Sequence, residues 1–158
     1  ANVLIGKSNY YLFYGYSIGC YWSFTNSSGA SFRINITGAA ISSAMSDTSS
    51  WHHLALIRKP ATSGAADYSD LEVYLDGVSI STTVNKYSAT LPLDNFGIIG
   101  AAGGVTGYYY NGNIDEVAIW NSDQSAEISN IYNATSSGKT ADLSTLSTPP
   151  TAWYRMGD

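Results

Sequence analysis

Hydrophobic and polar residues alternate along much of the chain, which is the pattern of β-strands with one buried face. Residues 31–37 give the clearest example, because Phe32, Ile34 and Ile36 fall on one face and polar side chains fall on the other. Similar runs, rich in β-branched and aromatic residues, predict strands over residues 10–16, 20–25, 51–58, 71–75, 78–82, 96–99, 114–121 and 151–155. The repeated period of two predicts an all-β fold.

An Asp-Gly pair, Asp76-Gly77, lies between two of these alternating runs. A two-residue type I′ turn needs positive φ at both central residues, which Asp tolerates and Gly prefers. The pair therefore predicts a β-hairpin that joins residues 71–75 to residues 78–82. Segments 26–29, 38–50, 60–69 and 100–107 are small, polar or glycine-rich, and we expect loops there.

One segment departs from the period of two. The Ser-Asp pair at 122–123 supplies a suitable N-cap for a helix. Ile128, Ile131 and Tyr132 then follow with helical spacing. We expect the only helix of the chain over residues 122–132.

The last part of the chain is poor in hydrophobic residues until its final strand. Residues 133–150 consist largely of Ser, Thr, Gly and Pro, and we expect a loop-like tail that leads to the strand 151–155. Short strands, turn-rich connections and one short helix predict a single domain over residues 1–158. Its expected architecture is an antiparallel β-sandwich of the jelly-roll type.

Composition supports this class of fold. Charged residues make up 12% of the chain, which is too few for a helical bundle or a coiled coil, and the 13 Tyr, 4 Trp and 4 Phe need burial. The net charge is −5, and basic residues never cluster beyond Arg58-Lys59. Without a basic track or a run of ~20 apolar residues, we expect neither nucleic-acid binding nor membrane insertion.

Three segments resemble motifs of one protein family, and they occur in that family's order. Residues 51–56 read Trp-His-His-Leu-Ala-Leu, residues 71–77 read Leu-Glu-Val-Tyr-Leu-Asp-Gly, and residues 112–120 read Gly-Asn-Ile-Asp-Glu-Val-Ala-Ile-Trp. Together they resemble the laminin-G-like, concanavalin A-like jelly roll. The resemblance implies two antiparallel sheets, often a calcium ion, and glycan or protein binding rather than catalysis.

The start of the chain departs from the family pattern. Domains of this kind usually open with further strands before the segment that corresponds to residues 5–7, so we expect the opening strands to be absent and a sheet edge to be uncovered. Trp153 and its strand are the candidates within the chain to close that edge, beside residues 1–37 or 112–121. The ending, residues 153–158, resembles boundaries between such modules in virion structural proteins, which predicts a larger chain or assembly.

Asp115 is the most informative polar residue. A strand over residues 114–121 places it on the face of Val117 and Ile119, so we expect it to be mostly buried and paired with strong donors or a cation. Calcium would suit it, because this ion takes six to eight oxygen ligands, which backbone carbonyls and nearby asparagines could complete. The alternative is a structural hydrogen bond to a neighbouring loop.

His52 and His53 are adjacent, and adjacent strand residues point to opposite faces. They are therefore not expected to bind one metal ion together. His53 shares its face with Trp51 and Ala55, so we expect a buried imidazole that makes hydrogen bonds.

The acidic residues do not favour catalysis. A glycosidase needs two carboxylates on one face, about 5–10 Å apart across the sugar. Asp115 and Glu116 are adjacent, which places them on opposite faces of a strand. We expect no enzyme, and glycoside hydrolase is the least favoured of three interpretations.

Tyr108, Tyr109 and Tyr110 follow the glycine-rich loop and precede Asn111 and Asn113. Exposed tyrosine rings stack on the C–H face of a sugar, and amide groups bind its hydroxyls. The segment is therefore a candidate ligand-binding site. The alternative is that alternate tyrosines pack beneath the loop.

Together, these observations predict a non-catalytic carbohydrate-binding or adhesion module on an extracellular or virion surface. Its expected partners are glycans, neighbouring protein chains, or both. The alternative from another class is a purely structural virion, fibre or decoration domain that only contacts other protein chains.

Overall fold

The computed structural model describes residues 2–7, 10–15, 19–25, 31–36, 38–58, 71–80, 83–85, 98–99, 109–132 and 141–156. The expected turn at 26–29 and the expected loops at 60–69 and 100–107 lie outside the described residues. None of the helices in the described part of the chain is long and apolar enough to cross a membrane.

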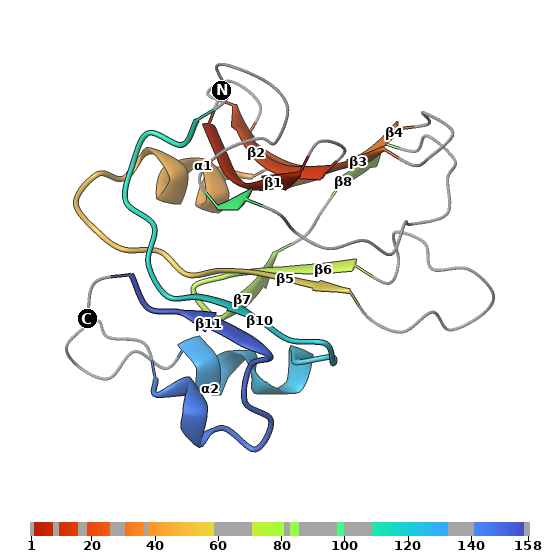
Figure 1. The fold of residues 1–158 in the computed structure, drawn as a ribbon. Helices are drawn as coiled ribbons and strands as arrows, with labels where there is room; N and C mark the ends of the chain where they lie inside the picture. The colour runs from red at the N-terminus through yellow and green to blue at the C-terminus, as the bar shows by residue number, and fades with distance from the viewer. Residues whose placement is uncertain are drawn as a thin grey trace.

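A six-stranded sheet forms one layer of the molecule (Figure 1). In spatial order its strands are β8 (Thr83–Asn85), β4 (Ser31–Ile36), β3 (Gly19–Thr25), β2 (Tyr10–Gly15), β1 (Asn2–Lys7) and β9 (Ile98–Ile99). The strands β1 and β8 were not expected from the sequence, whereas β2, β3 and β4 match their expected segments closely.

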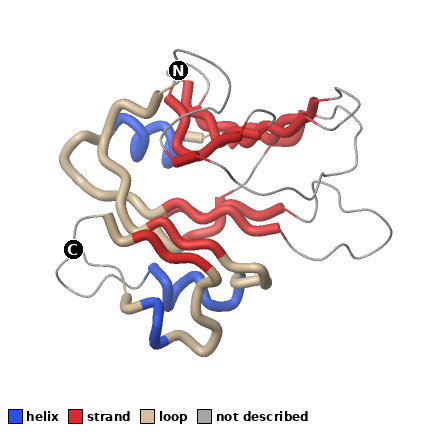
Figure 2. Tube along the Cα trace, viewed as in Figure 1, coloured by secondary structure: helices blue, strands red, loops and turns tan. Residues whose placement is uncertain are grey.

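A second layer lies across from this sheet. It contains the three-stranded sheet of β5 (Leu54–Arg58), β6 (Leu71–Leu75) and β7 (Val78–Ile80), and beside it the pair of β10 (Val117–Ile119) and β11 (Ala152–Tyr154) (Figure 2). Every pairing among the described strands is antiparallel. The predicted antiparallel β-sandwich is therefore confirmed.

The β6–β7 hairpin has the turn that the Asp-Gly pair predicts. Asp76 and Gly77 have φ values of 49° and 77°, and Leu75 pairs with Val78 across the turn. A Cβ atom on Gly77 would lie 2.6 Å from Cδ1 of Tyr132. Glycine is required here twice, once for its backbone conformation and once for the close approach of the Tyr132 ring.

Both faces of the β5–β6 pair are covered. Val73 and Leu75 alternate with Tyr74 along β6 and are buried on the other face of the strand, and Ile36 is buried within the six-stranded sheet. On the opposite face, Ala55, Ile57 and Tyr74 pack against a cluster that also contains Ile128, Ile131, Leu143, Ala118, Trp120 and Trp153. The short helices, with Trp120 and Trp153, thus cover the outer face of the β5–β6 pair.

The expectation of a loop over residues 38–50 is wrong, because α1 (Ala39–Ser46) lies within it. Ile41 and Ala44 are buried at helical spacing, and the helix packs beside β3. Alanine has the highest helix propensity, so tertiary packing and local preference agree here. The many serines of the segment obscured this pattern.

The helix expected over residues 122–132 is split and shorter. A 3₁₀ turn, η2 (Ser125–Glu127), leads into α2 (Ile128–Tyr132), and Oδ1 of Asp123 accepts a hydrogen bond of 2.9 Å from the Ser125 N–H. The tail expected over 133–150 contains a further turn, η3 (Leu143–Thr145), in which Leu143 is buried. The described residues thus contain two α-helices, α1 and α2, where the sequence predicted only one.

Candidate functional site

The residues Asp115 and Glu116, called the acidic corner below, do not continue the strand as expected. Glu116 has a φ of 52°, in the left-handed region that non-glycine residues rarely occupy. This break in the extended backbone shifts the alternation before β10, so Asp115 does not share the face of Val117. Asp115 is exposed, and the expectation that it is mostly buried is wrong.

Strong donors nevertheless reach Asp115, as expected. Its Oδ1 atom accepts hydrogen bonds from the backbone N–H of Glu116, at 2.8 Å, and of Met156, at 3.0 Å. The second bond joins positions that are 41 residues apart in the sequence. Asp115 thus connects the approach to β10 with the end of β11.

Glu116 holds the same C-terminal segment through its side chain. Its Oε2 accepts a hydrogen bond of 2.5 Å from Nε1 of Trp153, and its Oε1 lies 3.5 Å from Nε of Arg155. The Arg155 guanidinium in turn lies 4.9 Å from the centre of the Trp153 ring, in a cation–π contact. The expected docking of Trp153 beside residues 112–121 is confirmed, because Ala118 pairs with Trp153 in the β10–β11 ladder.

The segment 109–113 precedes the acidic corner. Tyr109 is 62% exposed, and Asn111 and Asn113 are exposed as well. Tyr110 is half-buried, and its ring lies so close to Gly112 that a Cβ there would be 2.8 Å from Cε1 of the ring. The two tyrosines therefore differ: Tyr110 packs on its own segment, and Tyr109 faces solvent. Tyr108 lies outside the described residues.

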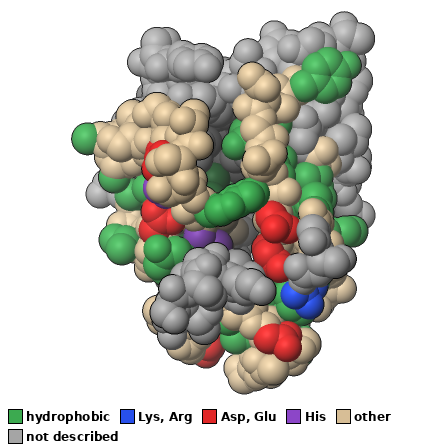
Figure 3. Space-filling view, turned by 90° about the vertical axis from the view of Figure 1, so that its left-hand side faces the viewer, with side chains coloured by type: hydrophobic (Ala, Val, Ile, Leu, Met, Phe, Trp, Pro, Cys, Tyr) green, Lys and Arg blue, Asp and Glu red, His purple; other side chains and the backbone are tan. Residues whose placement is uncertain are grey.

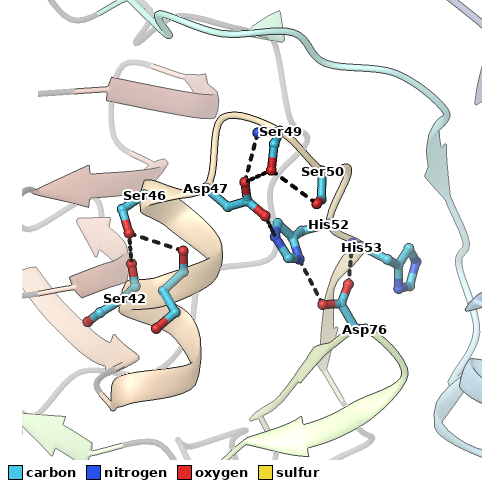
Figure 4. Close-up of polar contacts among 9 residues, drawn as sticks. Ser42, Ser46, Asp47, Ser49, Ser50, His52, His53 and Asp76 are labelled. Carbon is cyan, nitrogen blue, oxygen red and sulfur yellow. Dashed lines mark hydrogen bonds and ion pairs between the residues drawn. The ribbon is translucent and has the colours of Figure 1, made fainter.

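A second polar cluster joins the loop before β5 to the β6–β7 turn (Figure 4). The His52 ring lies between two carboxylates, with Nδ1 at 2.8 Å from Oδ2 of Asp76 and Nε2 at 3.4 Å from Oδ2 of Asp47. Asp76 also accepts a hydrogen bond of 2.8 Å from the backbone N–H of His53. We call Asp47, His52 and Asp76 the histidine clasp.

The charges of the clasp support one another. The hydrogen bond to Asp76 is the largest of the effects that raise the pKa of His52 above its usual value. Hydrogen bonds from the Ser49 hydroxyl, at 2.6 Å, and from the Ser49 backbone, at 2.7 Å, lower the pKa of Asp47. The clasp therefore favours a protonated imidazole between the two carboxylates.

His53 behaves in the opposite way. Its ring points away from that of His52 and lies 5.7 Å from the ring of Tyr132, measured between centroids (Figure 4). Burial lowers the pKa of His53. Its Nδ1 atom is buried and has no hydrogen-bond partner among the described residues, so the expected hydrogen-bonded imidazole is not found at that atom. The two rings do point apart, as their adjacency predicts.

The described residues contain no group of three or more His, Cys, Asp or Glu side chains that could hold a metal ion. Calcium at Asp115 was expected to draw on backbone carbonyls and asparagines as well, and it stays a prediction. Both hydrogen bonds of Asp115 described above end on Oδ1. Oδ2 is thus the oxygen that would face such an ion.

Comparison with known families decides the identity of the fold. Residues 1–128 match the family model Laminin_G_3, described as the concanavalin A-like lectin/glucanases superfamily. The chain belongs to this family. No curated protein and no solved structure matches it. For this laminin-G-like domain, the family suggests a role in carbohydrate binding or a related activity.

The match ends before the strand that completes the domain's β10–β11 pair. β11 lies at Ala152–Tyr154, beyond the matched residues, yet the acidic corner within the match holds it. The sequence indicated the pairing through the bulk of Trp153, but not the polar contacts that fix it.

Sequence reasoning also missed the histidine clasp. The laminin-G-like motif of residues 51–56 pointed to His52, but Asp47 lies in a segment interpreted as a loop. Asp76 was assigned only to the turn. The spacing of 24 residues between His52 and Asp76 becomes a contact because β5 pairs with β6. A hairpin register drawn from the sequence would have brought these residues together.

Proposed function

We propose that this laminin-G-like domain is a non-catalytic carbohydrate-binding module, and that its ligand contacts Tyr109, Asn111 and Asn113. The observation that carries the proposal is the 62% exposure of the Tyr109 side chain beside two exposed asparagines. A tyrosine ring offers a flat apolar surface to the C–H face of a pyranose, and asparagine both donates to and accepts from hydroxyl groups.

The segment packs on itself and is anchored at its C-terminal side, which favours binding by limiting the entropy lost on ordering. Tyr110 packs against Gly112 within the segment. The acidic corner ties the following residues to β11 through Met156 and Trp153. The backbone that follows Tyr109 is thus held in place.

The acidic corner supports a role without catalysis. Asp115 accepts two backbone hydrogen bonds through one oxygen, and Glu116 contacts Trp153 and Arg155. A retaining or inverting glycosidase needs one carboxyl group as an acid and one as a nucleophile or base, both facing the sugar. The contacts of Glu116 favour a structural role for its carboxylate.

A glycan array tests the proposal. The wild-type domain should give saturable binding that free sugar competes away, and Tyr109→Ala should lose at least most of that signal. Tyr154→Ala is the matched control, because Tyr154 is 50% exposed but lies on β11. The proposal fails if the wild-type domain binds no glycan, or if both variants bind as the wild type does.

A structural module that contacts only other protein chains is the second candidate. It is favoured by Val78, which is 66% exposed on β7, a strand that pairs only with β6 among the described strands. Unpaired strand edges recruit further strands. A virion or extracellular surface suits either function, and a mass measurement by light scattering across a hundredfold concentration range would detect self-association that Val78→Lys abolishes.

A further inference from the structure

Trp51 is an exposed aromatic side chain that the proposed site does not use. It lies in the loop of residues 47–53, between α1 and β5, and is 63% exposed. Tryptophan has the largest apolar surface of any side chain, so leaving it in water forgoes a large stabilisation. Its immediate neighbours Ser49 and Ser50 are exposed and polar, which gives an aromatic surface with hydroxyl groups beside it.

The loop that carries Trp51 is fixed on both sides of the residue. Before it, Asp47 accepts hydrogen bonds from the backbone and the hydroxyl of Ser49. After it, His52 contacts Asp76, and the His53 N–H donates to the same carboxylate. Trp51 therefore projects from a loop whose backbone needs little further ordering when a ligand binds.

The Trp51 loop and the Tyr109 segment lie on one side of the molecule. Figure 1 shows residues 109–116 running down the same side of the molecule as residues 47–53. Figure 3 views this side: among the side chains of the described residues, the acidic ones are spread over it and the basic ones are confined to a small area. Two exposed aromatic side chains thus belong to one acidic face.

We propose that Trp51 is a second aromatic platform of the carbohydrate-binding face, and that this face selects neutral oligosaccharides long enough to contact both Trp51 and Tyr109. The inference rests on the proposed function. The two segments contain Asp47, Asp115 and Glu116, no Lys or Arg, and the His52 imidazole, which lies between the carboxylates of Asp47 and Asp76. A uronic acid or sialic acid would meet like charge on this face, whereas a neutral pyranose meets none.

Titration calorimetry and tryptophan fluorescence test the inference with defined probes. The neutral probes are cellohexaose, laminarihexaose and chitohexaose, and the anionic probe is hexagalacturonate. The proteins are the wild type, Trp51→Ala, Trp51→Phe, Tyr109→Ala and Val78→Ala. Val78→Ala is the control for loss of an exposed apolar side chain, since Val78 is 66% exposed and lies on β7.

At least one neutral probe should bind the wild type, and Trp51→Ala should bind that probe about three- to tenfold more weakly. Trp51→Phe keeps a ring and should bind within about twofold of the wild type. The neutral probe should change the tryptophan emission of the wild type more than that of Trp51→Phe, because Trp51 is 63% exposed whereas Trp120 and Trp153 pack against the core cluster. Hexagalacturonate should bind more weakly than every neutral hexamer that binds.

The inference is overturned if Trp51→Ala binds as the wild type does while Tyr109→Ala is weakened, and the proposed function then stands. Tighter binding of hexagalacturonate than of the neutral hexamers overturns the choice of ligand class. If no hexamer binds the wild type, the inference fails, and the glycan array decides the proposed function separately. Should Trp51→Ala fold poorly, Trp51→Phe and the fluorescence change still test the contact.

Discussion

Single residues at the β6–β7 turn show how much of the structure depends on local backbone chemistry. Asp76 and Gly77 both have positive φ, as the Asp-Gly pair predicts. The sequence did not indicate that Tyr132 packs on the turn or that Asp76 accepts hydrogen bonds from two consecutive residues, His52 and His53. Turn geometry follows from local residue types, whereas these contacts depend on where α2 and β5 come to lie.

Gly77→Ala should lower the free energy of unfolding by about 2 kcal/mol or more, from the positive φ and the contact with Tyr132 together. Urea unfolding measures the change. A Tyr132→Ala background should reduce the loss, because it removes the ring that a Cβ would strike. If Gly77→Ala lowers the free energy of unfolding equally in both backgrounds, the Tyr132 ring moves aside without an energetic penalty.

Protonation of His52 should stabilise the fold, because both ring nitrogens face carboxylates. Its pKa is raised above the usual value of about 6.5, so this stabilisation is complete below that pH and is lost as pH rises through the folded-state pKa. Thermal melts of the wild type and His52→Gln from pH 5.5 to 9 measure it. The difference between the two should shrink with rising pH, and a constant difference would contradict a protonated clasp.

His53 acts in the opposite sense and has to be separated from His52. Its pKa is lowered by burial, so its contribution is present above its usual pKa and is lost as pH falls. The wild type and His52→Gln both contain His53, so the contribution of His53 cancels in the difference between their melting temperatures. The reverse comparison, with His53→Gln, should give a difference that changes with pH in the other direction.

Two substitutions of Asp115 distinguish its role as a hydrogen-bond acceptor from its proposed role as a calcium ligand. Asp115→Asn keeps an oxygen for the N–H groups of Glu116 and Met156 but removes the charge, whereas Asp115→Ala removes both. We expect Asp115→Ala to cost about 1 kcal/mol of stability without any added metal. If calcium binds, millimolar calcium should raise the melting temperature of the wild type but not of Asp115→Asn, and an equal response in both would exclude a calcium site at this residue.

At the scale of elements, alternation predicted β2, β3, β4 and β6 closely, but it did not indicate β1 or β8. It misplaced the phase of β10, because the left-handed φ of Glu116 interrupts the extended chain. It missed α1, whose Ile41 and Ala44 form a buried stripe among serines. Backbone irregularities and short helices fixed by packing leave weak signals in a single sequence.

The attachment of β11 depends on the acidic corner. Trp153→Phe keeps most of the packing against Ala118 and its neighbours but removes the indole N–H that donates to Glu116. We expect a loss of about 1–3 kcal/mol, since a charged acceptor loses its donor. Tyr154→Phe, at a more exposed position of β11, is the control and should be within about 0.5 kcal/mol of the wild type.

Hydrogen exchange would show where the Trp153→Phe loss acts. Faster exchange should appear at the β10–β11 amides before it appears in β5 or β6. A variant as stable as the wild type would mean that the Glu116–Trp153 contact contributes nothing to docking of the strand.

At the scale of the whole molecule, two antiparallel layers and a set of short helices bring distant segments to one acidic face. The fold class was predictable from periodicity and turn residues, and the laminin-G-like family from three motifs. The grouping of the Trp51 loop with the Tyr109 segment was not, because it depends on how the layers are stacked (Figure 1). The sequence therefore predicted individual candidate binding residues but not the surface that they share.

Amide chemical-shift mapping with a neutral hexasaccharide tests the central claim most directly. Titration of cellohexaose, laminarihexaose and chitohexaose into the ¹⁵N-labelled domain should, for at least one of them, give saturable shifts in residues 109–113 and 47–53. The amides of β7 should not move, because the edge of this strand belongs to the alternative function. An absence of shifts with every hexamer, or saturable shifts that leave residues 109–113 unchanged, would contradict the account.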